Sequence, residues 1–194
     1  MSDDFQQRGG SPWGTPPGGG GNGSGKGPTP PDVDKIINII EAIEPTFGGI
    51  NLEDIEAPRC FDIEEALLGI GIPVMHDDQH GTAIVVLAAL INSAKVVGKK
   101  LEDLKIVFNG AGAAGTAIAK LLLCVNTDKK ICTKVNEIIL CDSKGIIYDG
   151  REDLNEFKQQ MSKMTNPENK EGTLKDALKD ADVFIGVSKG NLLK

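Results

Sequence analysis

Three apolar runs of different length and period predict the main elements of the chain. Isoleucines recur at helical spacing over residues 36–43, and Pro45 ends that pattern, so we expect a helix there. Residues 82–97 are apolar on nearly every face and are closed by Gly98, which predicts a long, buried helix. The shorter run over residues 104–108 is typical of a buried parallel strand.

Shorter patterns complete an alternation of helices and strands. The further elements that we expect are helices over residues 60–68, 116–124, 153–163 and 173–180, and strands over residues 72–75, 137–141 and 183–187. Strands that alternate with helices in this way predict an α/β fold with a Rossmann-like, doubly wound parallel sheet.

Residues 1–31 differ from the rest of the chain in composition. They hold ten glycines and six prolines, and Phe5 and Trp13 are their only large apolar residues. Such a segment buries too little apolar surface to offset the entropy of ordering it. We therefore expect a disordered Gly/Pro-rich tail before the globular part.

Charge and composition narrow the class of protein. The 194 residues carry a formal net charge of −7, which argues against a nucleic-acid partner. The apolar run over residues 83–91 stops at Asn92, short of a membrane span, and no secretory signal opens the chain. We therefore expect a cytoplasmic protein with reduced thiols at its four cysteines, which lack CxxC spacing: Cys60, Cys124, Cys132 and Cys141.

A glycine-rich turn follows the strand at 104–108 and opens a helix. Gly110, Gly112 and Gly115 fit the G-x-G-x-x-G pattern, in which the glycines permit a tight turn, close approach of a diphosphate, and packing of helix on strand. The helix N-terminus offers free N–H groups to phosphate oxygens. This context predicts a dinucleotide site.

An acidic residue follows at the end of the next strand. Asp142 lies 27 positions after Gly115, whereas about 20 is usual, and a lengthened polar loop over residues 126–136 accounts for the excess. A carboxylate there can accept hydrogen bonds from an adenosine ribose and repel a 2′-phosphate, which favours NAD. Lys144 can offset that repulsion, so the choice between NAD and NADP stays open.

Two acidic pairs flank a helix-strand unit that could bring them together: Glu53-Asp54 and Asp77-Asp78. Carboxylates that converge repel one another unless a divalent cation lies between them, and oxygen ligands favour Mg²⁺ or Mn²⁺ over zinc. The alternative is solvated loop charge at the first pair and a helix cap at the second.

Two histidines, His76 and His80, lie four residues apart beside the second acidic pair. Asp77 stands where a zinc metalloprotease helix would carry glutamate, and no cysteine is near in sequence. We therefore expect each histidine to orient a carboxylate or cap a backbone group.

Several segments, in the same order, resemble bacterial malic enzymes: residues 47–55 (FGGINLEDI), 57–61 (APRCF), 74–83 (VMHDDQHGTA), 108–115 (FNGAGAAG) and 140–148 (LCDSKGIIY). The resemblance covers residues 32–194. It implies that residues 32–97 end a substrate and metal domain and that residues 98–194 are part of an NAD(P)-binding domain. It also implies oxidative decarboxylation of malate to pyruvate and CO₂, with NAD or NADP and with Mg²⁺ or Mn²⁺.

The resemblance assigns roles by position. Glu53, Asp54 and Asp78 match the metal-binding carboxylates, and Asp77 matches the carboxylate that supports the catalytic lysine. The matching dinucleotide-binding residues are Gly110, Gly112, Ala113, Gly115, Asp142 and Ser143.

The sequence also departs from the family. The tyrosine and lysine that transfer protons in malic enzymes lie upstream of FGGINLED, where this chain has its Gly/Pro-rich tail, and Tyr148 is in the wrong segment. The family continues past Lys194 with further strands. We therefore expect an incomplete sheet, a homo-oligomer formed through exposed surfaces, and weak or no malic enzyme activity from this polypeptide alone.

An alternative to an enzyme is a non-catalytic NAD(P)-binding module or a degenerate fusion product. The tail supplies a separate resemblance, because residues 11–14 and 30–32 are similar to the N-terminus of HflK-type membrane protease regulators. That similarity would place a fusion near Asp32, whereas an unrelated flexible tail is the other interpretation.

Overall fold

The computed structural model describes residues 32–128, 130–188 and 190. The tail over residues 1–31, which was expected to be disordered, lies outside the described residues.

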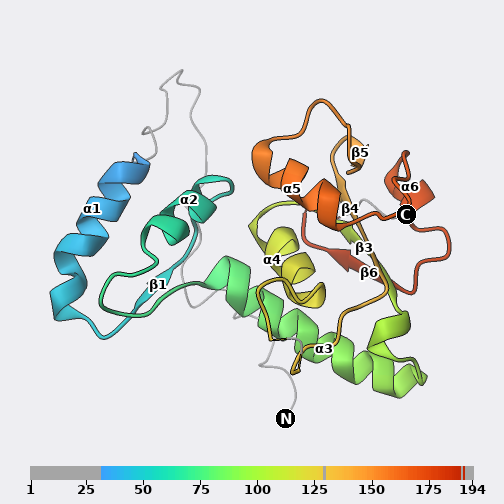
Figure 1. Cartoon of the computed structure of the whole chain (residues 1–194), viewed down its shortest axis with the longest axis horizontal. Coiled ribbons are helices and arrows are strands. Elements are labelled where there is room, and N and C mark those ends of the chain that lie inside the picture. Colours follow the sequence, from blue (N-terminus) through green and yellow to red (C-terminus); the bar gives the residue numbers. More distant parts are fainter. Residues whose placement is uncertain (1–31, 129, 189, 191–194) are drawn as a thin grey trace, which may run out of the picture. The chain divides into compact units, whose positions relative to one another are not determined.

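A four-stranded sheet organises the C-terminal half (Figure 1). Its strand order is β5-β4-β3-β6, and β4 pairs antiparallel with β5 while the other pairs are parallel. The strands are β3 (Lys105–Asn109), β4 (Glu137–Asp142), β5 (Gly145–Ile146) and β6 (Val183–Gly186).

Helices cover both faces of this sheet, because alternate side chains of each strand point to opposite sides. Ile106 and Phe108 belong to the larger core with three helices, whereas Val107 packs in a second core with one short helix. The three helices of the larger core are α3 (Thr82–Val97), α4 (Ala113–Leu122) and α5 (Glu156–Met164). The short helix of the second core is α6 (Leu174–Ala177). The α/β, Rossmann-like fold is thereby confirmed.

A second, two-stranded parallel sheet lies in the N-terminal half, where β1 pairs with β2. Ile40, Leu52, Ile63 and Leu67 form its core together with two helices. The elements are α1 (Val33–Ile43), β1 (Ile50–Leu52), α2 (Arg59–Ala66) and β2 (Val74–His76). The short connecting helices are η1 (Glu44–Thr46) and η3 (Leu101–Asp103), and a π-helical turn, η2 (Asp77–Gly81), joins β2 to α3.

Several expected elements differ from the structure in their bounds or in their type. The glycine-rich helix begins at Ala113 rather than residue 116, because Gly112 takes the N-cap position. The strands β1 and β5 were not expected, since each is only two or three residues long. Residues 77–81, for which the sequence analysis names no helix or strand, form the π-helical turn.

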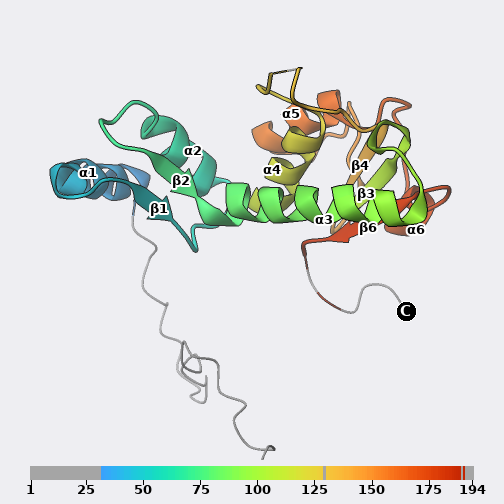
Figure 2. The ribbon, with the colours of Figure 1, turned by 90° about the horizontal axis from the view of Figure 1, so that it is seen from below.

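The expectation that residues 82–97 are buried holds for only one stripe of the helix. One stripe of α3, formed by Ala83, Leu90 and Ala94, is buried, while Val85 and Val96 are 68% and 86% exposed. Figure 2 shows α3 running lengthwise past α4 toward the β3 and β6 region. Within the described residues, the elements packed against α3 therefore cover only part of its apolar surface.

The segment that contains α3 also concerns the expectation that the chain has no membrane span. The segment Asp77–Val97, with a mean hydropathy of 1.6, is long and apolar enough to cross a membrane by length and composition. The sequence did not predict such a segment, because the uninterrupted apolar run stops at Asn92. The core helix of a soluble protein passes the same test, so this segment alone does not identify a span.

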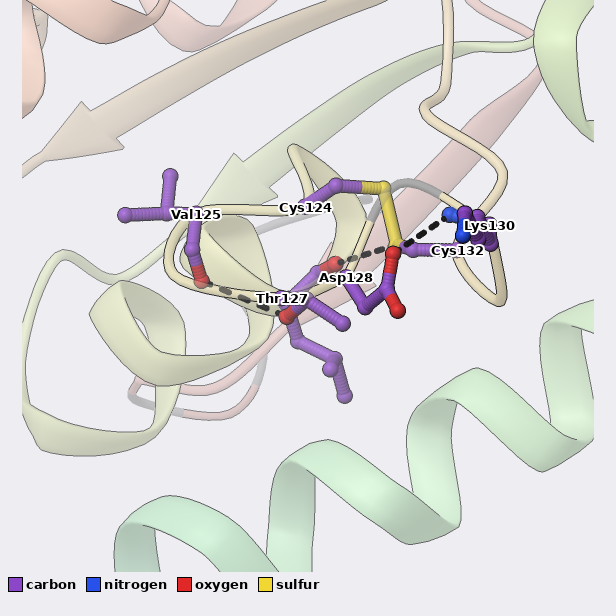
Figure 3. Close-up of a disulfide and its surroundings, with 7 residues drawn as sticks. Cys124, Val125, Thr127, Asp128, Lys130 and Cys132 are labelled. Atoms are coloured by element: carbon purple, nitrogen blue, oxygen red, sulfur yellow. Dashed lines mark hydrogen bonds between the residues drawn. A yellow bond between two sulfur atoms is a disulfide. The ribbon is translucent and has the colours of Figure 1, made fainter.

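The expectation of four reduced thiols was also wrong. Cys124 and Cys132 form a disulfide across the loop that follows α4 (Figure 3), whereas Cys60 and Cys141 are free and buried. The loop turns back sharply, with Cys124 and Asn126 in the left-handed backbone region, and this brings two cysteines eight positions apart within bonding distance. The spacing of the cysteines in the sequence does not predict this disulfide, because the two residues are eight positions apart.

Candidate functional site

The glycine-rich turn and Asp142 lie at the same edge of the sheet. In the parallel β3–β4 pair, Asn109 is opposite Cys141, and the N–H of Gly110 donates to the carbonyl of Cys141 at 2.8 Å. The chain therefore leaves β3 into the glycine turn beside the point where β4 reaches Asp142. Ligands of open α/β sheets bind at this carboxyl edge.

The three glycines of the turn meet different constraints. Gly110 has φ +126°, and a Cβ there would lie 2.8 Å from the carbonyl oxygen of Val187. A Cβ on Gly115 would lie 2.0 Å from the carbonyl oxygen of Gly110. Both glycines are thus required by the fold itself.

Gly112 is different, because a Cβ there would meet nothing within 4 Å. It is the N-cap residue of α4, and Ala113 is the first residue of that helix. The fold does not require glycine at this position, so the open space beside it is available to a ligand at the helix N-terminus.

Asp142 is held by two cationic side chains that the sequence analysis did not identify. Arg151 Nη2 donates to both of its carboxylate oxygens at 2.9 Å, and Lys158 Nζ lies 2.7 Å from Oδ2. The backbone N–H of Lys144 also donates to it at 2.9 Å. The Asp142 side chain is only 10% exposed.

These contacts change the acidity of the group. Burial acts to raise the pKa of Asp142, but hydrogen bonds from Lys158, the Lys144 N–H and Arg151 outweigh it and hold the pKa below its usual range. Hydrogen bonds to Asp153 and Asp142 raise the pKa of Arg151. Asp142 is therefore an ionised, already partnered carboxylate, and a ribose hydroxyl would join an existing network.

The remaining residue predicted for the dinucleotide site, Ser143, lies in the turn between β4 and β5 and is exposed. Lys144, its neighbour, has its Nζ 2.6 Å from the carboxylate of Asp153. Arg151 lies two positions from Asp153 and nine from Asp142 in the sequence. Only the fold shows that its guanidinium group contacts both carboxylates.

The second acidic pair lies in the π-helical turn η2. π-turns are rare and often occur at functional sites. An ideal Cβ built on Gly81 would lie 2.2 Å from Oδ1 of Asp77, so the carboxylate of Asp77 folds over the end of the turn. Neither Asp77 nor Asp78 caps α3, whose N-cap is Gly81 without a side-chain hydrogen bond.

Asp78 is linked to the first acidic pair. Its Oδ2 accepts a hydrogen bond from the backbone N–H of Asp54 at 2.9 Å, across 24 positions of sequence. Asp54 has φ +57°, a conformation that is uncommon for a residue with a side chain. The fold thus brings one residue of each pair into contact, which is one of the two arrangements that the sequence left open.

Glu53 is directed differently, because its Oε2 accepts from Asn51 Nδ2 at 3.4 Å. Across the parts of the chain that the structure describes, no group of three or more His, Cys, Asp or Glu side chains is placed to hold a metal ion. The donor chemistry of Glu53, Asp54 and Asp78 suits a hard divalent cation. Their side chains, as they stand, do not form a complete coordination site.

The two histidines have different surroundings. His80 Nε2 lies 2.6 Å from Oε1 of Glu64, so the expectation that it orients a carboxylate is confirmed. For His76 the expectation was wrong, since it is fully buried and neither ring nitrogen has a hydrogen-bond partner within the described ranges. Glu64 itself had no sequence signal that set it apart from neighbouring acidic residues of α2.

The free cysteines are not poised to act as nucleophiles. Burial, with a smaller contribution from nearby negative charges, raises the pKa of Cys60 to about 11. Burial and the Asp142 carboxylate raise the pKa of Cys141 to about 12. Both thiols are therefore protonated at neutral pH.

Comparison with known protein families matches two adjacent parts of the chain. The family model described as "Malic enzyme, NAD binding domain" matches residues 79–192, and that described as "Malic enzyme, N-terminal domain" matches residues 29–68.

Individual relatives agree with the family models. The chain is 54% identical over 164 residues to the bifunctional malic/malolactic enzyme of Bacillus subtilis, covering 84% of this chain and 38% of that protein. It is 47% identical to the NADP-dependent malic enzyme of Haemophilus influenzae, covering 84% of this chain and 20% of that protein.

Solved structures show the same similarity. The NAD-dependent malic enzyme of Thermotoga maritima superposes with a TM-score of 0.77 at 48% identity, covering 84% of this chain and 42% of that one. The chain therefore spans between a fifth and about two fifths of the length of these relatives.

Proposed function

Because this chain belongs to the malic enzyme family, we propose that it contributes to the oxidative decarboxylation of malate to pyruvate and CO₂. NAD or NADP would be the hydride acceptor, and Mg²⁺ or Mn²⁺ the metal ion. The observation that carries the dinucleotide part is the open space at Gly112, in the turn that follows β3 at the carboxyl edge of the sheet.

Each predicted residue of the dinucleotide site has a defined part in this proposal. The N–H groups of Gly112 and Ala113, at the N-terminus of α4, would bind the diphosphate. Asp142 and the exposed Ser143 would bind the adenosine ribose. Gly110 and Gly115 would act indirectly, since they allow the turn to adopt its shape.

The cation is proposed on the family resemblance and on one contact. Glu53, Asp54 and Asp78 would hold it, and the hydrogen bond between Asp54 and Asp78 supports a shared location. A cation held by these carboxylates would supply Lewis-acid chemistry, because it would stabilise negative charge that develops on an oxygen of the substrate. Asp77, in the same turn, is proposed as the carboxylate that orients a catalytic lysine.

We also propose the larger-scale assignments made from the sequence. Residues 32–97 would belong to the substrate and metal domain and residues 98–194 to the NAD(P)-binding domain, which the positions of the two matching family models support. The exposed apolar face of α3 supports a homo-oligomer. A cytoplasmic location is proposed because the relatives are metabolic enzymes.

A second function, a non-catalytic NAD(P)-binding module, is favoured by a specific observation. The described residues hold no complete group of metal-ligating side chains. In contrast, the glycine-rich turn and Asp142 follow two paired strands at the same edge of the sheet, which supports a dinucleotide site. The two functions agree on dinucleotide binding and differ on turnover.

Titration of the full chain with NADH and NADPH, followed by nucleotide fluorescence with and without Mn²⁺, tests the proposal. We expect binding by the unchanged chain and a rise of at least about tenfold in Kd for Gly112→Ala, because its methyl group would occupy the diphosphate position. The Gly112→Ala variant should keep its stability, since that methyl meets no protein atom within 4 Å.

Gly115→Ala is the matched control, since its methyl would collide with the Gly110 carbonyl and lower stability instead. Equal affinity of the unchanged chain and Gly112→Ala would contradict the site. Nicotinamide reduction with malate and Mn²⁺ then separates the two functions, and we expect little or no turnover from this chain alone.

A further inference from the structure

The π-helical turn that carries Asp77 and Asp78 is held in place by a carboxylate from another element. Gln79 Nε2 donates to Oε2 of Glu64 at 3.1 Å, and His80 Nε2 lies 2.6 Å from Oε1 of the same group. Both oxygens of Glu64 are therefore used, each by a different residue of the turn. Glu64 belongs to α2, 15 and 16 positions earlier in the sequence.

The two bonds differ in exposure, because the one from Gln79 is partly buried whereas the His80 side chain is 47% exposed. Gln79 is 4% exposed, so its amide requires a partner within the protein, and the Glu64 side chain is only 17% exposed. A carboxylate bonded at both oxygens restrains the two donors relative to each other as well as to α2. The restraint acts on residues 79 and 80, directly after the two aspartates.

The turn is held from its other side as well. Oδ2 of Asp78 accepts from the N–H of Asp54, which follows β1, and Asp77 folds over Gly81. The turn also packs against α4, the helix that begins at the glycine-rich turn.

We propose that Glu64 is a positioning residue that clamps η2 to α2 and thereby sets the direction in which Asp77 and Asp78 point. It contacts neither a ligand nor the reacting atoms in this role. The effect on the cation rests on the function proposed above for Asp78, whereas the clamp itself does not.

Hydrogen exchange read by mass spectrometry tests the clamp on the full chain without any ligand. We expect Glu64→Ala to speed exchange of the amides of residues 77–82 by about tenfold, because two hydrogen bonds to a charged group are lost. Glu64→Gln should stay within about twofold of the unchanged chain, since its amide oxygen can accept from Gln79 and its amide nitrogen can donate to His80.

Glu65→Ala is the matched control, because it removes the same charge one position along α2 from an exposed side chain. His80→Ala removes half of the clamp from the other side and is expected to speed exchange by a smaller factor, so the test stands if Glu64→Ala does not fold. Unchanged exchange in both Glu64→Ala and His80→Ala would overturn the proposal.

Titration with Mn²⁺ alone, followed by electron paramagnetic resonance, provides the second measurement. We expect Glu64→Ala to raise the Kd for Mn²⁺ by at least about tenfold, and Glu64→Gln and Glu65→Ala to stay within about threefold. If the unchanged chain binds Mn²⁺ and Glu64→Ala binds it equally well, the positioning role is wrong. If the unchanged chain binds no Mn²⁺, the proposed metal site fails, and hydrogen exchange still decides the clamp.

Discussion

At the scale of single residues, Asp142 stabilises the carboxyl edge of the sheet independently of any ligand. Its carboxylate lies between Arg151, which is 8% exposed, and Lys158. Removing one partner of such a buried group leaves the other charges uncompensated, and this lowers the free energy of unfolding. Asp142 therefore has a structural role in addition to its proposed contact with a ribose.

Asp142→Asn is expected to lower the free energy of unfolding at pH 7 by about 3 kcal/mol. Because the pKa of Asp142 is lowered in the folded state, its contribution is complete above the unfolded value near 3.8 and is lost as the pH falls through the folded value. The difference between variant and unchanged chain should therefore shrink below pH 4, as measured by urea unfolding.

The matched control for this change is Asp103→Asn, which alters an exposed carboxylate in η3. It should change stability by less than about 0.5 kcal/mol. A loss for Asp142→Asn no larger than that of Asp103→Asn would show that the ion pairs with Arg151 and Lys158 contribute little.

At the scale of elements, the disulfide closes the loop between α4 and β4. Val135 donates its N–H to the carbonyl of Leu122 at 3.1 Å, so the loop starts and ends on neighbouring backbone, and the disulfide lies inside this closure. A cross-link stabilises the folded state by limiting the conformations of the unfolded chain. This stabilisation increases only slowly with the length of the closed loop.

Cys132→Ser is expected to lower the free energy of unfolding by about 2–3 kcal/mol for a loop of this length under non-reducing conditions. In the presence of a reductant the variant and the unchanged chain should unfold alike, because neither then has the cross-link. Urea unfolding with and without reductant measures both effects.

Thiol counting provides a check that does not depend on stability. The unfolded, unreduced chain should show two reactive thiols, Cys60 and Cys141, and the reduced chain should show four. Four thiols without a reductant would mean that the disulfide does not form in the purified protein and would restore the expectation made from the sequence.

At the scale of the whole molecule, α3 leaves a wide apolar surface uncovered within the described residues. Val85 and Val96 lie eleven positions apart, close to three helical turns, and therefore share a face. Exposed apolar side chains on one helix favour association, and here the polar Asn92 lies between the two valines on their shared face. This surface supports the proposed homo-oligomer more directly than the edge of the sheet does.

Val85→Lys and Val96→Lys, introduced together, are expected to shift the chain from oligomer toward monomer, because two charges would have to be buried in the contact. Sedimentation velocity over a dilution series measures the change. Ile131→Lys is the control, since Ile131 is 83% exposed in the disulfide-closed loop and lies on no helix. A monomer that persists at high concentration in the unchanged chain would contradict the prediction.

Local sequence patterns determined the larger elements of this protein. The helix Thr82–Val97 and the strand at 137–142 were predicted within one residue, because apolar periodicity and a terminal glycine are local signals. The glycine spacing likewise predicted the turn at 110–115, since positive φ and close backbone approach leave few alternatives to glycine.

Only the tertiary structure decided which side chains meet. The pairing of Asp142 with Arg151 and Lys158, the clamp at Glu64 and the disulfide at Cys124 join residues whose spacing follows no periodic rule. Burial of α3 was misjudged for the same reason, because a pattern shows that a surface is apolar but cannot show whether another element covers it. Contacts between elements depend on how the chain returns to itself, which local periodicity does not encode.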